Sequence, residues 1–202
     1  MKRMLTLLLA LLLLGGAAAA EGFDCLELEK TPDCLVYQEA PGVNTVVRPM
    51  EQPFECTVDR EGDELVCCLD FIEMPNEEAV FLRLTLSLMT RSPLNANEMT
   101  IEVDGVCYAF PVTAMASEYD QLFFEDYTVC ITDESLPMIR AIARSRRDGF
   151  GATLMGTESV ACTLSLPPES VAVIYDRYID LGGKQQDLSI FRDLWPVRIT
   201  NK

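Results

Sequence analysis

The sequence contains no histidine among its 202 residues. Without an imidazole, the chain lacks the Ser-His-Asp and Cys-His arrangements that activate a nucleophile. Histidine-ligated zinc sites and imidazole acid–base catalysis are excluded for the same reason. Gly-rich phosphate loops, G-x-S-x-G elbows and S-x-x-K motifs are also missing. We therefore assign no catalytic residue, metal ligand or cofactor from the sequence, and paired carboxylates remain as the route to acid–base hydrolysis.

Basic residues are scarce as well. The chain has 16 lysines and arginines against 32 aspartates and glutamates, which gives a net charge of −16. A charge of this sign repels phosphate backbones and anionic lipid headgroups, so we expect neither a nucleic-acid partner nor a membrane surface. Solubility alone explains the charge, and a cation or a basic partner is the functional alternative. A protein or a carbohydrate remains the expected class of partner.

Long apolar runs are confined to the N-terminus. Lys2 and Arg3 precede an apolar stretch over residues 4–14, and small residues follow up to Ala20. This order is typical of a cleavable secretory signal peptide, here residues 1–20. An uncleaved anchor is the alternative, but a membrane-spanning helix needs about 20 apolar residues and this run is shorter. We therefore expect a secreted, periplasmic or cell-envelope protein with no integral membrane span after cleavage.

All eight cysteines lie after the predicted signal peptide. An even number of cysteines in an exported chain predicts disulfide bonds. The paired C-x-x-C knuckles of zinc clusters are absent. Many connectivities are compatible with the sequence. The candidates for pairing are Cys25, Cys34, Cys56, Cys67, Cys68, Cys107, Cys130 and Cys162.

Strand parity sorts six of these cysteines, because neighbouring residues of a strand point to opposite faces. The apolar sides of the predicted strands carry Cys56, Cys67 and Cys162. The polar sides carry Cys68, Cys107 and Cys130. A Cys107–Cys130 bond is the preferred pairing, since both residues lie on polar faces of neighbouring segments. A Cys56–Cys67 bond fits the first predicted hairpin, and a Cys25–Cys34 bond would tie down the N-terminal arm.

Prolines interrupt the segment that follows the signal peptide. Residues 21–53 contain Pro32, Pro41, Pro49 and Pro53. Because clustered prolines punctuate regular structure, we interpret this segment as an irregular N-terminal arm. The mature chain of about 180 residues suits one domain, which we place at residues 54–202 as a single β-rich unit.

Period-two alternation is the clearest structural signal in the chain. One face of the segment 82–88 carries Leu82, Leu84, Leu86 and Leu88. This pattern predicts a half-buried strand of an antiparallel sheet. Asp104-Gly105 is a favoured two-residue turn, which would pair Val103 with Val106 and Met99 with Phe110 on one apolar face. Further hairpins are predicted over residues 54–71 and 150–166, and a further strand over residues 122–132.

Two helices are predicted in the C-terminal half. Ser135 can cap the first helix, and Pro137 suits its first turn. Pro167-Pro168 opens the second helix, which should end near Gly182-Gly183. The predicted fold class is therefore mainly β (α+β), an antiparallel β-sandwich-like domain with one or two helices in the C-terminal half.

Charged clusters are the remaining candidate sites. Acidic residues gather at residues 59–64, 77–78, 118–120 and 125–126, but their spacing selects no catalytic pair, and turn and edge charge explains them. A calcium loop over residues 59–63 lacks the EF-hand pattern. The one basic cluster consists of Arg140, Arg144, Arg146 and Arg147. A helix C-terminus attracts such residues through its dipole, and a patch that docks an acidic partner is the functional alternative.

The expected function is a non-enzymatic binding or envelope-associated module that works through a surface. The alternative is a carboxylate-dependent, glycosidase-like hydrolase. A deep pocket with two carboxylates about 5–9 Å apart would favour the hydrolase. A flat or convex surface with an exposed apolar patch would favour the binding module.

Export predicts a mature protein that begins at Glu21. The reason is that signal peptidase cleaves after small residues, here Ala20. N-terminal sequencing and intact mass of the protein recovered from the exported fraction would check this, and a product that still starts at Met1 would contradict it.

Overall fold

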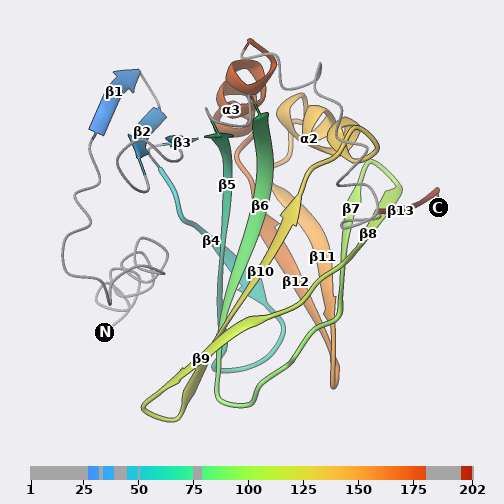
Figure 1. Ribbon diagram of the computed structural model, residues 1–202. Helices are drawn as coiled ribbons and strands as arrows, with labels where there is room; N and C mark the ends of the chain where they lie inside the picture. The colour runs from blue at the N-terminus through green and yellow to red at the C-terminus, as the bar shows by residue number, and fades with distance from the viewer. Residues whose placement is uncertain are drawn as a thin grey trace.

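A computed structural model of the protein describes residues 27–31, 34–38, 45–49, 51–74, 79–180 and 197–201. The predicted signal peptide, Cys25 and the acidic pair at residues 77–78 lie outside these ranges. The described residues form a mainly β, antiparallel structure with two helices in the C-terminal half, which confirms the predicted fold class (Figure 1).

The first sheet, sheet A, is built around three long strands. These are β5 (Glu64–Met74), β6 (Ala79–Thr90) and β10 (Leu122–Cys130). β6 lies between β5 and β10, and β10 continues to the short strand β9 (Met115–Tyr119). On the other side, residues 71–73 of β5 begin a series of short strands, β3 (Thr45–Pro49), β2 (Cys34–Gln38) and β1 (Glu27–Thr31).

The second sheet, sheet B, has the strand order β4-β12-β11-β7-β8-β13. In chain order its strands are β4 (Phe54–Val58), β7 (Glu98–Val103), β8 (Val106–Pro111), β11 (Gly149–Met155), β12 (Ser159–Ser165) and β13 (Arg198–Asn201). β4 belongs to both sheets. Its residues 54–56 pair with β5, and its residues 57 and 58 pair with β12. The chain therefore crosses from one sheet to the other within a single strand.

The core lies between the two sheets. Leu82, Leu84, Leu86 and Leu88 of β6 are all buried in it, as their alternation predicts. The β7–β8 hairpin also has the predicted register, with Val103 opposite Val106 and Met99 opposite Phe110. Asp104 and Gly105 both adopt positive φ, which is the backbone conformation that a type I′ turn requires.

The two helices lie at one end of the sandwich (Figure 1). α2 (Leu136–Ala143) buries Met138, Ile139 and Ile142, and α3 (Pro168–Asp180) follows Pro167 as predicted. Ser135 is the N-cap residue of α2, but its hydroxyl does not cap the helix. It accepts the backbone N–H of Thr132 instead, at 3.0 Å. None of the helices in the described residues is long and apolar enough to cross a bilayer.

Residues 21–53 are not an irregular arm where the structure describes them, because they supply β1, β2 and β3. Val46 and Val47 of β3 are buried, and β3 extends the ladder of β5. Pro49 is the last residue of β3 and Pro53 immediately precedes β4. Pro49 and Pro53 thus lie at the ends of short strands, where the missing N–H costs little.

Besides β1, β2 and β3, the sequence pattern did not predict β9 and β13. β9 pairs with β10 through a two-residue turn, in which Asp120 and Gln121 have φ of 50° and 64°. Neither residue is a glycine, so the usual hairpin signal is missing. All residues of β9 are exposed, and the sequence therefore carries no buried alternation that would reveal the strand.

Gly156 marks a close approach of two loops at the end of the sandwich opposite the helices. A Cβ at this position would lie 2.2 Å from the backbone oxygen of Leu94 and 2.8 Å from that of Asn95. Backbone atoms cannot move aside as a flexible side chain can, so any larger residue separates the β11–β12 turn from the loop before β7.

Gly156→Ala should lower the free energy of unfolding by about 1–3 kcal/mol, the range for overpacked sites. Urea denaturation would measure it. The matched control is Gly151→Ala, because a Cβ at Gly151 meets nothing within 4 Å. Equal stability of the two variants would contradict the described approach of the loops.

Candidate functional site

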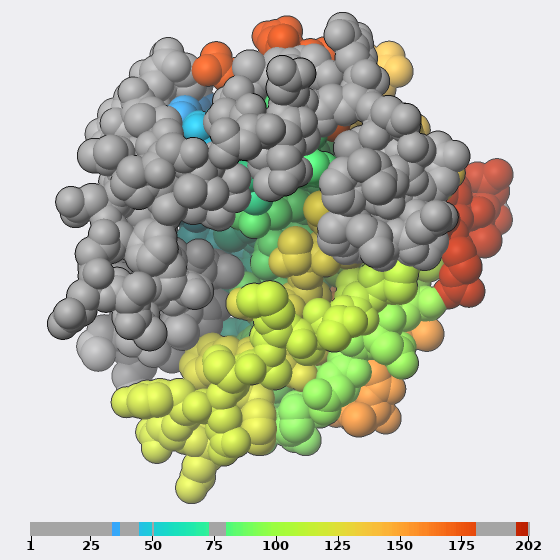
Figure 2. All heavy atoms as spheres, in the orientation of Figure 1, coloured from blue at the N-terminus to red at the C-terminus, as the bar shows by residue number. Residues whose placement is uncertain are grey.

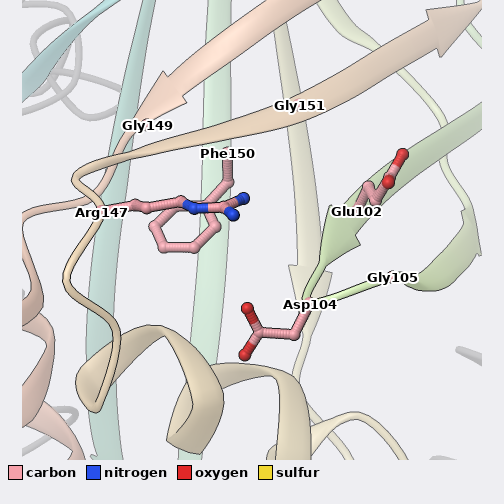
Figure 3. Close-up of a pocket in the computed structure, with 7 residues that line it drawn as sticks. All are labelled: Glu102, Asp104, Gly105, Arg147, Gly149, Phe150 and Gly151. Atoms are coloured by element: carbon pink, nitrogen blue, oxygen red, sulfur yellow. The ribbon is translucent and has the colours of Figure 1, made fainter.

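A shallow cleft lies beside the β7–β8 hairpin (Figure 3). Its volume is about 250 Å³, and Glu102, Asp104 and Arg147 supply its charged groups. Glu102 comes from β7, Asp104 from the tight turn and Arg147 from the loop between α2 and β11. The buried ring of Phe150 is part of the wall.

The two carboxylates of this cleft do not converge. Figure 3 shows the carboxylate of Glu102 and that of Asp104 pointing in different directions, with the Arg147 guanidinium on the opposite wall. Glycoside hydrolysis requires two carboxyl groups that flank one bond. Small-molecule sites also usually enclose about 300–1,000 Å³. The arrangement is therefore that of a charged surface groove.

The acidic cluster at residues 59–64 is held by Arg60. Its guanidinium lies 3.0 Å from the Asp63 carboxylate and also binds Glu158 in the β11–β12 turn and the hydroxyl of Thr90. Burial raises the pKa of Asp63 above its usual value. These contacts tie the β4–β5 turn to a turn of sheet B. No group of three or more potential metal ligands occurs among the described residues.

Glu125, in the acidic cluster at residues 125–126, is fully buried. Its side chain is 0% exposed, and its carboxylate accepts the backbone N–H groups of Leu94 at 2.9 Å and Asn95 at 2.8 Å. The hydroxyl of Tyr127 accepts the N–H of Ala96 at 3.1 Å, and burial raises the pKa of that phenol. Glu125 and Tyr127 thus anchor the loop before β7.

The predicted arginine patch is exposed. Arg140 lies in α2, Arg144 is its C-cap residue, and Arg146 and Arg147 follow in the loop. All four side chains are exposed, and the structure brings Arg147 into the charged cleft. Docking of an acidic partner on these residues stays a prediction.

No disulfide bond joins any two of the seven cysteines in the described residues. The preferred Cys107–Cys130 pairing is wrong, because the two residues lie on the outer faces of different sheets. In the strand register, Cys107 lies opposite Glu102, on the face of β8 that points away from the core. Cys130 lies opposite Arg83, on the outer face of sheet A. Two sheets packed about 10 Å apart separate them. Parity predicts the face within one sheet but not which sheet a strand joins.

A second apolar cluster lies on the outer face of sheet A, away from the main core. Val66 of β5 and Met89 of β6 are buried there, with Leu122 and Phe124 of β10 packed against them. In the strand register, Met89 lies opposite Phe124, and Leu122 lies opposite Tyr119 of β9. Apolar side chains therefore continue across the outer face of the sheet to its edge.

This edge is exposed. Met115 and Tyr119 lie on the outer face of β9 and are 75% and 71% exposed, more than Met155 at 40% or Ile199 at 46%. Among the described strands, β9 pairs only with β10. The β9–β10 hairpin projects at the lower left of the molecule in Figures 1 and 2. We call Met115, Tyr119, Leu122 and Phe124 the β9 face.

A structural role for Glu125 predicts that Glu125→Gln costs about 1–3 kcal/mol of unfolding free energy, because the amide leaves a buried backbone N–H without an acceptor. Urea denaturation would measure the loss. Glu118→Gln is the matched control, since Glu118 is exposed on the same hairpin. A variant as stable as wild type would show that Glu125 does not hold the loop.

Comparison with known proteins assigns no family to the chain. No protein-family model matches it, and neither a curated protein nor a solved structure is similar to it. What the protein does is therefore inferred from the burial, charges and contacts of its own residues.

Proposed function

We propose that the protein is an exported, non-enzymatic binding module that docks an extended segment of a partner protein along β9. The observation that carries the proposal is the exposure of Met115 and Tyr119 on one face of an edge strand. Large apolar side chains in this position are unfavourable in water unless a partner covers them. The export of the module is supported by its N-terminal sequence.

Strand addition suits the geometry of β9. An edge strand presents backbone N–H and C=O groups that a second strand can pair with. In this recognition mode the main-chain hydrogen bonds give affinity, and alternate side chains give specificity. On the β9 face, Met115 and Tyr119 would contact alternate residues of the incoming strand, and the apolar cluster of β10 would extend that contact.

The charge of the hairpin indicates the chemistry of the partner. Glu118 and Asp120 are exposed beside the apolar residues, and the whole chain carries a net charge of −16. Complementary charge speeds association and disfavours acidic partners. The proposed partner segment therefore alternates apolar residues with lysine or arginine.

The hydrolase hypothesis has weaker support. Its carboxylates would have to converge on one substrate bond, and those of Glu102 and Asp104 point apart (Figure 3). The carboxylate of Glu125 accepts two backbone N–H groups of the loop before β7, so it does not face a substrate. The binding module therefore accounts for more of the described surface.

Photo-crosslinking tests the proposal in cells that produce and export the full chain. A photoreactive amino acid replaces Tyr119 in one variant and Met155 in the control, because Met155 is exposed on sheet B. We expect adducts with a partner protein from position 119 that are at least several-fold more abundant than from position 155. Mass spectrometry of the adduct would identify the crosslinked segment.

Two outcomes would overturn this proposal. Equal adduct yields at the two positions would mean that β9 is not selective, and no adduct at position 119 would mean that the edge has no protein partner. An adduct of two copies of this chain would keep strand addition at β9 but would replace the basic partner with self-association.

A further inference from the structure

Three thiols meet where β4 passes from sheet A to sheet B. They belong to Cys56 of β4, Cys67 of β5 and Cys162 of β12. The strand register brings the three residues together, because Phe54 lies opposite Cys67 and Val58 lies opposite Cys162. Cys56 lies between these two positions on β4 and shares their core-facing side. No other strand of the described residues belongs to both sheets.

Contacts single out two of the three thiols. The backbone of Ser165 contacts both sulfurs, because its N–H donates to Cys56 and its carbonyl oxygen accepts the thiol of Cys67. The N–H of Ser165 lies 3.4 Å from the sulfur of Cys56, and its carbonyl oxygen lies 3.3 Å from the sulfur of Cys67. The thiol of Cys162 instead contacts the carbonyl oxygen of Ala152, at 3.6 Å.

These contacts make the two thiols unequal. The neighbouring thiol of Cys67 lowers the pKa of Cys56, and the interaction with Cys56 together with burial raises the pKa of Cys67 well above its usual value. Burial raises the pKa of Cys162 to about 12. A thiolate is the attacking species in exchange with disulfides. Cys56 is also only half-buried, whereas Cys67 and Cys162 are buried.

We propose that Cys56 and Cys67 form a thiol–disulfide exchange site that takes a disulfide as its substrate and closes a Cys56–Cys67 bond. Cys56 is the attacking residue and Cys67 the resolving residue. This assignment names one pair among the cysteines of the described residues, and it leaves Cys162 as a thiol. It does not depend on the partner of β9 or on the destination of the protein.

The reaction proceeds in two balanced steps. Cys56 loses its proton, and its sulfur attacks a disulfide RSSR, so that a Cys56–SR mixed disulfide forms and RS⁻ leaves and takes up a proton. Cys67 then loses its proton and attacks the sulfur of Cys56, which releases a second RSH. Two protein thiols are oxidised by two electrons, and one disulfide is reduced to two thiols.

The position of the pair gives the bond a structural consequence. β4 contributes only residues 54–56 to its ladder with β5 before it turns to β12. A covalent link from Cys56 to Cys67 would hold this short ladder together and would thereby fix the strand that joins the sheets. Oxidation should therefore raise the unfolding temperature of the protein, as other disulfides do by constraining the unfolded chain.

The test uses the purified full chain, reduced and then exposed to glutathione disulfide as the probe. Free thiols are alkylated at intervals, and peptide mapping by mass spectrometry locates the bond. We expect one link, between the peptides of Cys56 and Cys67, that forms at least about tenfold faster than any other link between described cysteines, because both sulfurs contact the backbone of Ser165. The link should disappear when the protein is oxidised in urea.

Three variants separate the roles of the thiols. Cys162→Ser is the matched control and should form the link at the wild-type rate. Cys67→Ser should stop at a glutathione adduct on Cys56, because no resolving thiol remains. Cys56→Ser should give neither the adduct nor the link, because the attacking sulfur is absent.

Several results would overturn the proposal. These are a faster link from Cys56 to Cys162, loss of the link in Cys162→Ser, or oxidation of the native protein with no preference among its thiols. Circular dichroism of each variant reports whether it folds. If a serine variant fails to fold, peptide mapping of the wild-type protein alone decides which pair closes.

Discussion

The rest of the structure depends on one strand that is shared by two sheets. β4 pairs with β5 in sheet A through residues 54–56 and with β12 in sheet B through residues 57 and 58. This arrangement closes one side of the sandwich and brings the alternating leucines of β6 against the apolar face of the β7–β8 hairpin. Among the described strands, β1 and β9 of sheet A and β13 of sheet B each pair with a single neighbour. Closure through β4 thus leaves β9 and β13 as edge strands on the side away from β4.

Local rules in the sequence predict much of this fold. The register of the β7–β8 hairpin follows from Asp104-Gly105, because a tight turn fixes every pair that follows it. The buried face of β6 follows from period two, and the buried stripe of α2 follows from helical spacing. These features need only neighbouring residues. The assignment of a strand to a sheet needs distant ones, and the Cys107–Cys130 pairing was wrong for that reason.

The candidate site was harder to predict because burial decides whether a charged side chain holds the backbone or faces solvent. Glu125 and Glu118 look alike in the sequence, yet Glu125 is enclosed and accepts two backbone N–H groups while Glu118 is exposed. Arg60 likewise holds a turn through Asp63. The β9 face carried no signal, since its strand has no buried alternation and its turn has no glycine. The thiol cluster was partly predictable, because parity placed Cys56 and Cys67 on one face.

Amide hydrogen exchange of the native protein tests most directly whether β4 joins the sheets and leaves β9 open. Exchange is slow where a backbone N–H is bonded in a stable ladder and fast where it faces water. The account predicts that β4 amides are protected like those of β5 and β12, whereas alternate amides of β9 exchange quickly. Fast exchange throughout β4, or uniform protection along β9, would contradict it.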